Sequence, residues 1–173
     1  MLPFRAVPTA IFPKGGIFMR NHLRAESDPK EPGKENQALS TSFLAYILKV
    51  EGGYVHHPKD PGGATRYGIT QKNLERAGEI LRELPESVRD LSVEGASRIF
   101  YTFYYLPARC NLLPWPLSLV HFDGAVHCGV CRAGKLLQQT LNRLVFPAIP
   151  LEVDGRVGPR TLERVRSFLL SGK

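Results

Sequence analysis

A stretch rich in glycine and proline between residues 51 and 70 constrains this chain more than any other feature. It reads Glu51-Gly52-Gly53-Tyr54, then Asp60-Pro61-Gly62-Gly63-Ala64-Thr65, then Tyr67-Gly68-Ile69-Thr70. Glycine and proline interrupt regular elements and favour tight turns, so the sequence predicts a folded-back loop here. Two carboxylates and a hydroxyl, those of Glu51, Asp60 and Thr65, are carried by this stretch.

The residues before the loop predict the helix that delivers Glu51. Hydroxyl residues at 40–42 can serve as the N-cap, and residues 43–50 have apolar side chains at helical spacing until Gly52-Gly53 ends the pattern. Glu51 continues this apolar stripe, and burial there would disfavour its charged form and raise its pKa, as a general acid requires. The alternative is an ordinary glutamate that reaches solvent at a helix C-terminus, where the helix dipole disfavours its charge.

The loop also supplies partners for such an acid. In glycoside hydrolysis one carboxyl protonates the leaving group, while a second group stabilises the oxocarbenium-like transition state or activates water. Asp60 and Thr65 suit the second role, so we expect Glu51, Asp60 and Thr65 to be catalytic. Asp60 is equally consistent with a turn residue whose side chain bonds its own backbone before Pro-Gly.

Further candidates for substrate contact lie around the loop. Tyr54 and Tyr67 flank it, either stacking on sugar rings or packing beneath the loop, and Gln71 follows it. We expect these three residues to bind substrate. The pair His56-His57 could bind a metal or the substrate, but we prefer an exposed polar turn before Pro58.

These motifs resemble the signature of glycoside hydrolase family 108, the N-acetylmuramidases that include phage endolysins and secretion-activator proteins of Gram-negative bacteria. The resemblance implies that the Glu of Glu-Gly-Gly-Tyr, here Glu51, is the essential catalytic residue. It also implies hydrolysis of the β-1,4 bond between N-acetylmuramic acid and N-acetylglucosamine in peptidoglycan. The order Glu, Asp, Thr is similar to the catalytic triad of phage-type lysozymes, with a gap between Asp60 and Thr65 that is one residue shorter.

Three downstream segments extend the resemblance. Residues 100–109 resemble the family's aromatic helix, with Leu106 where Trp is usual, and residues 122–129 resemble a second helix, with His127 where Asn is typical. Residues 153–162 resemble an element of the predicted peptidoglycan-binding region of these proteins. Asp123 and His127 are four residues apart on one predicted helix face, so we expect them to hydrogen-bond and to support the active-site lobe from inside.

The periodicity of the chain predicts a mainly α, lysozyme-like α+β fold, with helical lobes and a small β-hairpin beside the active-site cleft. The hairpin would pair residues 54–55 with 67–69, and N-cap hydroxyls at Thr70 and Ser92 would begin two of the helices. Residues 1–39 are expected to be a disordered extension, because 27–36 are dense in charged residues, proline and glycine. Residues 40–116 would form the catalytic region, and 117–170 a peptidoglycan-binding helical region packed on it.

Charge and length suggest where such a protein works. The formal net charge is +7, and four arginines (Arg156, Arg160, Arg164 and Arg166) cluster near the last predicted helix. Such a cluster could indicate nucleic acid, but peptidoglycan is also anionic, and we expect a wall partner and no nucleic acid. We further expect a monomer without stable membrane insertion or a classical signal peptide, made in the cytoplasm. It would reach the periplasm and wall through a holin or a secretion channel.

The cysteines suggest a competing hypothesis, a zinc-binding protein. Cys128 and Cys131, with Cys110 and nearby histidines, have elements of a zinc site, but the second cysteine pair of a structural site is missing. We therefore expect buried cysteines that act as small hydrophobic residues, and neither a metal nor a cofactor. A basic zinc or nucleic-acid module is accordingly the least favoured hypothesis.

Two questions of function stay open at this point. A non-catalytic peptidoglycan-binding or secretion-accessory protein could keep the fold, with Leu106 and His127 marking lost activity. A muramidase could serve either phage lysis or local wall opening during secretion, and it could use retaining or inverting chemistry.

Overall fold

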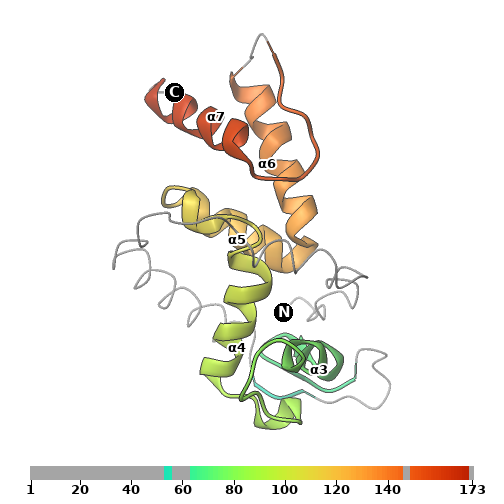
Figure 1. Ribbon diagram of the computed structural model, residues 1–173. Coiled ribbons are helices and arrows are strands. Elements are labelled where there is room, and N and C mark those ends of the chain that lie inside the picture. Colours follow the sequence, from blue (N-terminus) through green and yellow to red (C-terminus); the bar gives the residue numbers. More distant parts are fainter. Residues whose placement is uncertain (1–52, 56–62, 146–148, 172–173) are drawn as a thin grey trace. The chain divides into compact units, whose positions relative to one another are not determined.

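The computed structural model describes residues 53–55, 63–145 and 149–171. The chain divides into two compact units, Met1–Tyr101 and Thr102–Lys173, each of which is described by itself (Figure 1). Glu51, Asp60 and the pair His56-His57 lie outside the described residues, as does the predicted extension 1–39.

The first described elements of the first unit form a tight hairpin. Strand β1 (Thr65–Arg66) pairs antiparallel with β2 (Ile69–Thr70), and Val55 forms an isolated antiparallel bridge to Thr65. The predicted pairing of 54–55 with 67–69 was therefore wrong in register. Tyr67 and Gly68 have φ of 52° and 72°, the left-handed pair that a two-residue hairpin turn requires. A two-residue turn has a lower entropic cost of closure than the predicted hairpin, whose connection would contain Asp60.

Side-chain caps begin the helices of this unit. The hydroxyl of Thr70 accepts the Asn73 N–H at 3.2 Å and starts α3 (Gln71–Gly78). Ser87 caps the short 3-10 helix η1 (Val88–Asp90), and Ser92 accepts the Gly95 N–H at 3.0 Å at the start of α4 (Val93–Phe100). The caps predicted at Thr70 and Ser92 are thus confirmed. The backbone after α4 continues as a π-helix, η2 (Tyr101–Tyr105). The helix that Ser92 caps therefore changes from α to π geometry at Tyr101.

Apolar side chains from all of these elements are buried. On α3 and α4 the apolar residues recur every three or four positions, so one face of each helix is buried. The buried set in the first unit comprises Ile69, Leu74, Ala77, Val88, Leu91, Ala96, Ile99 and Phe100. The hairpin and η1 therefore pack on the same apolar core as α3 and α4.

The second unit is helical throughout its described elements. A 3-10 turn, η3 (Cys110–Leu112), precedes α5 (Leu117–Cys128), α6 (Val130–Val145) and α7 (Pro159–Leu170). Gly129, with φ of 89°, separates α5 from α6, and Pro159 stands at the start of α7. Both breaks have a local cause, because glycine tolerates positive φ and proline suits a first helical turn.

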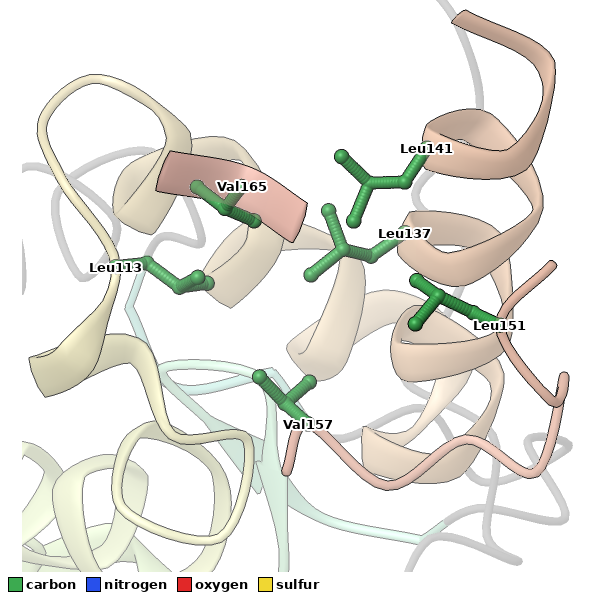
Figure 2. Packing of buried hydrophobic residues seen from close by; sticks show 6 residues of the cluster. All are labelled: Leu113, Leu137, Leu141, Leu151, Val157 and Val165. Atoms are coloured by element: carbon green, nitrogen blue, oxygen red, sulfur yellow. The ribbon is translucent and has the colours of Figure 1, made fainter. Parts of the chain in front are cut away.

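One apolar cluster holds the second unit together. Figure 2 shows side chains from α6, from α7, from the connection between them and from the segment before α5 pointing toward one another. The cluster consists of Leu113, Leu137, Leu141, Leu151, Val157 and Val165, each less than a tenth exposed. Burying a side chain of this kind contributes about 1.5–3 kcal/mol relative to its exposed state. The cluster thus draws the α6–α7 connection onto the helices.

The described part of the chain is mainly helical with one small antiparallel sheet, as predicted. Among the described residues, no helix has both the length and the apolar character needed to cross a membrane.

Candidate functional site

Six of the eight predicted site residues lie in the described part of the chain. Tyr54, Thr65, Tyr67 and Gln71 belong to the first unit, whereas Asp123 and His127 belong to the second. Catalytic, substrate-binding and supporting roles for these residues stay predictions. The structure shows which of them lie together and what else lies beside them.

Thr65 sits where the Val55 bridge meets the hairpin. Two backbone hydrogen bonds of 2.8 Å join Val55 and Thr65, so the two ends of the segment that contains Asp60 in the sequence lie side by side. Among the described residues, the Thr65 hydroxyl makes only a long contact of 3.5 Å, to the Val55 carbonyl oxygen. This half-buried hydroxyl therefore retains capacity for another hydrogen bond.

Two arginines lie next to the predicted tyrosines. The Arg66 guanidinium lies 5.2 Å from the Tyr67 ring centroid, and that of Arg89 lies 5.8 Å from the Tyr54 ring centroid, within cation–π range. Arg66 Nη1 also donates to the backbone carbonyl of Arg89. These contacts bring the hairpin turn, η1 and Tyr54 to one place in the first unit.

Gln71 holds η1 in position. Its Oε1 accepts the Val88 N–H at 2.8 Å, and its Nε2 donates to the Glu86 carbonyl at 2.7 Å and to Glu75 Oε1 at 3.1 Å. Both amide hydrogens are thereby used within the protein. The structure thus gives Gln71 a definite part in fixing the segment that carries Arg89, in addition to its predicted contact with substrate.

Sequence reasoning missed Arg66 and Arg89. Arg66 stands between Thr65 and Tyr67 in the motif, so its place beside two candidate residues was a usable signal. Arg89 is 23 residues further along the chain, and no local pattern connects it to Tyr54. Only the packing of η1 on the hairpin brings the two arginines together.

Asp123 and His127 meet on α5 as their spacing predicted. His127 Nδ1 lies 2.9 Å from the Asp123 carbonyl oxygen and 3.4 Å from Asp123 Oδ1. Their side chains are 56% and 57% exposed, however, so the predicted position inside the lobe was wrong, while a supporting role stays a prediction. The apolar residues of this helix, Phe122 and Val126 among them, take the buried face instead.

The three cysteines and His121 differ in burial and in the groups that they contact. Cys110 is fully buried, which raises the pKa of its thiol to about 12, whereas Cys128 is half-buried and Cys131 is exposed. Cys110 alone fits the prediction of buried cysteines. His121 is buried with its Nε2 3.2 Å from the Ala108 carbonyl, and burial lowers its pKa. No three His, Cys, Asp or Glu side chains gather as metal ligands in the ranges that the structure describes.

The Asp-Gly-x-x-Gly-Pro element of residues 154–159 is a loop fastened to α6. The buried Gln138 accepts the Gly155 N–H at 2.8 Å and donates to Asp154 Oδ1 at 2.8 Å and to the Arg156 carbonyl at 3.0 Å. The Gln138 amide and the Arg156 N–H hold the pKa of Asp154 below its usual range. This element therefore has a structural role in the second unit.

A small basic pocket follows this loop. Its lining comprises Leu151, Arg160, Glu163, Arg164 and Ser167. Arg164 Nη2 donates to the Ile149 carbonyl at 3.1 Å, while its Nη1 is buried without a hydrogen-bond partner. The two arginines outnumber the Glu163 carboxylate, so the pocket carries a net positive charge that favours an anion.

Comparison with known proteins places the chain in a family. The model of the glycosyl hydrolase 108 family matches residues 44–129, a range that contains Glu51, Asp60 and Thr65. The solved structure of Brucella abortus SagA is 33% identical in sequence, with a TM-score of 0.61 over 76% of this chain and 70% of that chain. No curated protein matches the chain.

The chain is therefore a glycoside hydrolase by class, with a lysozyme-like α+β fold. It belongs to the glycosyl hydrolase 108 family.

Proposed function

We propose that this protein is a peptidoglycan hydrolase that cleaves the β-1,4 bond between N-acetylmuramic acid and N-acetylglucosamine. The match of the glycosyl hydrolase 108 family to residues 44–129 carries this proposal. The basic character of the chain, with a net charge of +7, supports it, because bacterial walls are anionic. The site of action would be the periplasmic wall, during cell lysis or local wall opening for secretion.

In this proposal Glu51 is the general acid that protonates the leaving sugar oxygen as the glycosidic bond breaks. Asp60 and Thr65 position water or stabilise the positive charge that develops on the sugar ring. The long 3.5 Å contact of the Thr65 hydroxyl supports its part, since this group can accept or donate a further hydrogen bond. No cofactor or metal is needed for this chemistry.

Residues 40–116 would contain the catalytic machinery, and 117–170 would contribute wall binding. The pocket of α7, with Arg160 and the partly unsatisfied Arg164, supports the second assignment. Carboxylates of the wall are ligands that arginine binds well.

Substitution of Glu51 tests the proposed reaction. Glu51→Gln keeps the size of the side chain but removes the transferable proton, so turbidity clearing and zymogram activity on purified sacculi should fall by about 10²- to 10⁴-fold. Thermal unfolding should be close to that of the wild type. Glu79→Gln, a substitution of an exposed glutamate after α3, is the matched control and should keep full activity.

Equal clearing by Glu51→Gln and the wild type would remove the assignment of Glu51. If the wild type binds sacculi without releasing reducing sugars, the protein is instead a non-catalytic wall-binding accessory.

A further inference from the structure

The first unit carries two positive charges that no carboxylate among its described residues neutralises. Arg66 and Arg89 each lie over a tyrosine ring, at 5.2 and 5.8 Å from its centroid. The hydrogen bond donated by the Arg66 side chain goes to a backbone carbonyl, that of Arg89, and neither arginine forms an ion pair in the described ranges. A guanidinium has five N–H donors; Arg66 Nε is buried, but donors on the terminal nitrogens of both side chains remain for a ligand.

Both arginines are held on fixed backbone. Arg66 precedes the two-residue turn at Tyr67 and Gly68, and its pairing with Ile69 sets its register. The N–H of Arg89 donates to the Ser87 hydroxyl at 3.2 Å, and Gln71 fastens the neighbouring Val88. A ligand that binds to prearranged side chains loses less conformational entropy than one that must order them.

The pair also lies beside a predicted catalytic residue. Arg66 follows Thr65 directly, and Tyr54 precedes the Val55 that bridges to Thr65. Thr65 and Arg66 are consecutive in β1, whose successive side chains point to opposite faces, so the closeness of Arg66 to Thr65 is along the backbone. An arrangement of tyrosine rings and guanidiniums suits a sugar that bears a carboxylate, because rings stack on sugar faces and guanidinium pairs with carboxylate.

We propose that Arg66 and Arg89, with Tyr54 and Tyr67, form a subsite that binds a carboxylate of the glycan substrate. This inference rests on the proposed function and adds a basis for selectivity. A neutral β-1,4 glycan has no group for the two charges, whereas peptidoglycan offers carboxylates on its stem peptides and, at muramic acid residues that carry no stem peptide, on the lactyl ether. The subsite therefore selects acidic glycans over neutral ones.

The test measures equilibrium binding of the full chain to purified sacculi at fixed ionic strength. Arg66→Gln and Arg89→Gln should each weaken binding by roughly 5- to 10-fold, since each removes a charge-assisted contact. Arg82→Gln removes the same charge from an exposed arginine of the same unit, whose side chain has no ring contact or hydrogen bond with another described residue, and it should bind as the wild type does. Affinities for Arg66→Gln and Arg89→Gln equal to that of Arg82→Gln would overturn the proposal.

Chemically modified sacculi make the test specific for carboxylates. Amidation of the sacculus carboxyls should weaken binding of the wild type by a larger factor than that of Arg66→Gln or Arg89→Gln, each of which has already lost one of the two charges. Removal of stem peptides with an amidase then separates the two sources. Because stripping frees the lactyl carboxyl, which intact sacculi hold as an amide, a deficit of the arginine variants that grows on stripped glycan identifies the lactyl carboxylate, and one that disappears identifies the stem peptide. If amidation weakens wild type and variants equally, the proposed subsite is wrong.

The subsite and the proposed reaction can fail separately. Arginine-dependent binding without release of reducing sugars would overturn the hydrolase and keep the subsite, whereas wall hydrolysis unaffected by the arginines would do the reverse. Arg89→Gln keeps the test interpretable if Arg66→Gln fails to fold, because the hydrogen bond from Arg66 reaches the backbone of Arg89 and survives that substitution.

Discussion

Single glycines decide how closely the C-terminal loop approaches α6. Gly155 has φ of 84°, and a Cβ atom at this position would lie 2.5 Å from the Cys131 carbonyl oxygen. A Cβ atom on Gly134 would in turn lie 2.1 Å from the Gly155 carbonyl oxygen. Glycine is therefore required on both sides of this contact, for backbone conformation at one residue and for space at both.

Gly155→Ala should destabilise the protein by roughly 3 kcal/mol, because it combines a left-handed backbone with a steric clash. Denaturant titration followed by circular dichroism measures the change. Gly158→Ala is the control, since a Cβ at Gly158 meets no atom within 4 Å and its φ is −95°. Comparable losses of unfolding free energy in Gly155→Ala and Gly158→Ala would show that the backbone conformation and the close contact at Gly155 do not cause the loss.

Buried His121 predicts a pH dependence of stability. Burial is the main influence on its pKa and lowers it below the unfolded value, so the unfolded state takes up the proton first as the pH falls. Its contribution is complete above about pH 6.5 and is lost progressively below that pH. Unfolding free energies at pH 7.5 and pH 5 should therefore differ less in His121→Gln than in the wild type. His127→Gln, which removes an exposed histidine, should keep the wild-type difference.

At the scale of elements, local signals placed the helices well. Caps at Thr70 and Ser92, the break at Gly129 and the start at Pro159 were all predictable, because capping and helix breaking involve residues within a few positions. Strand pairing was predicted with the wrong register, since a turn with positive φ at a tyrosine has a weak sequence signal. The segment around η1 was not predicted, although Ser87 caps it.

Substitution of Gln138 tests the hydrogen bonds that hold the Asp154 loop against α6. In Gln138→Leu the buried N–H of Gly155 loses its acceptor, and an unsatisfied buried donor costs about 1–3 kcal/mol. We expect a loss of stability in that range, accompanied by faster amide exchange in residues 151–158. Gln139→Leu makes the same change at the next, exposed position of α6 and should have little effect. A similar loss in both variants would argue against the network.

At the scale of the whole molecule, family membership and net charge are the relevant properties. The family match covers residues 44–129, and the basic pocket of α7 lies beyond it in sequence. The excess of basic residues predicts that attraction to an anionic wall falls as salt screens it.

Binding of the full chain to sacculi should therefore weaken steadily between 50 and 500 mM NaCl, a range over which the Debye length falls from more than about 10 Å toward about 4 Å. Arg160→Gln should lower the affinity at low salt and flatten this dependence, because it removes a charge from the α7 pocket. Arg143→Gln, at an exposed position near the end of α6, serves as the charge-matched control. Salt-independent binding would exclude an electrostatic contribution of this kind.

The amino-acid sequence by itself determined the helical character of the chain, the ends of its main helices and the motif around Glu51, Asp60 and Thr65. These features depend on neighbours in sequence, where spacing and residue type carry the information. Only the tertiary structure decided that Val55 pairs with Thr65, that Arg89 joins Arg66 beside the tyrosines, and that Gln138 holds the Asp154 loop. Each of these contacts joins residues at least ten positions apart, and packing, not local preference, selects such partners.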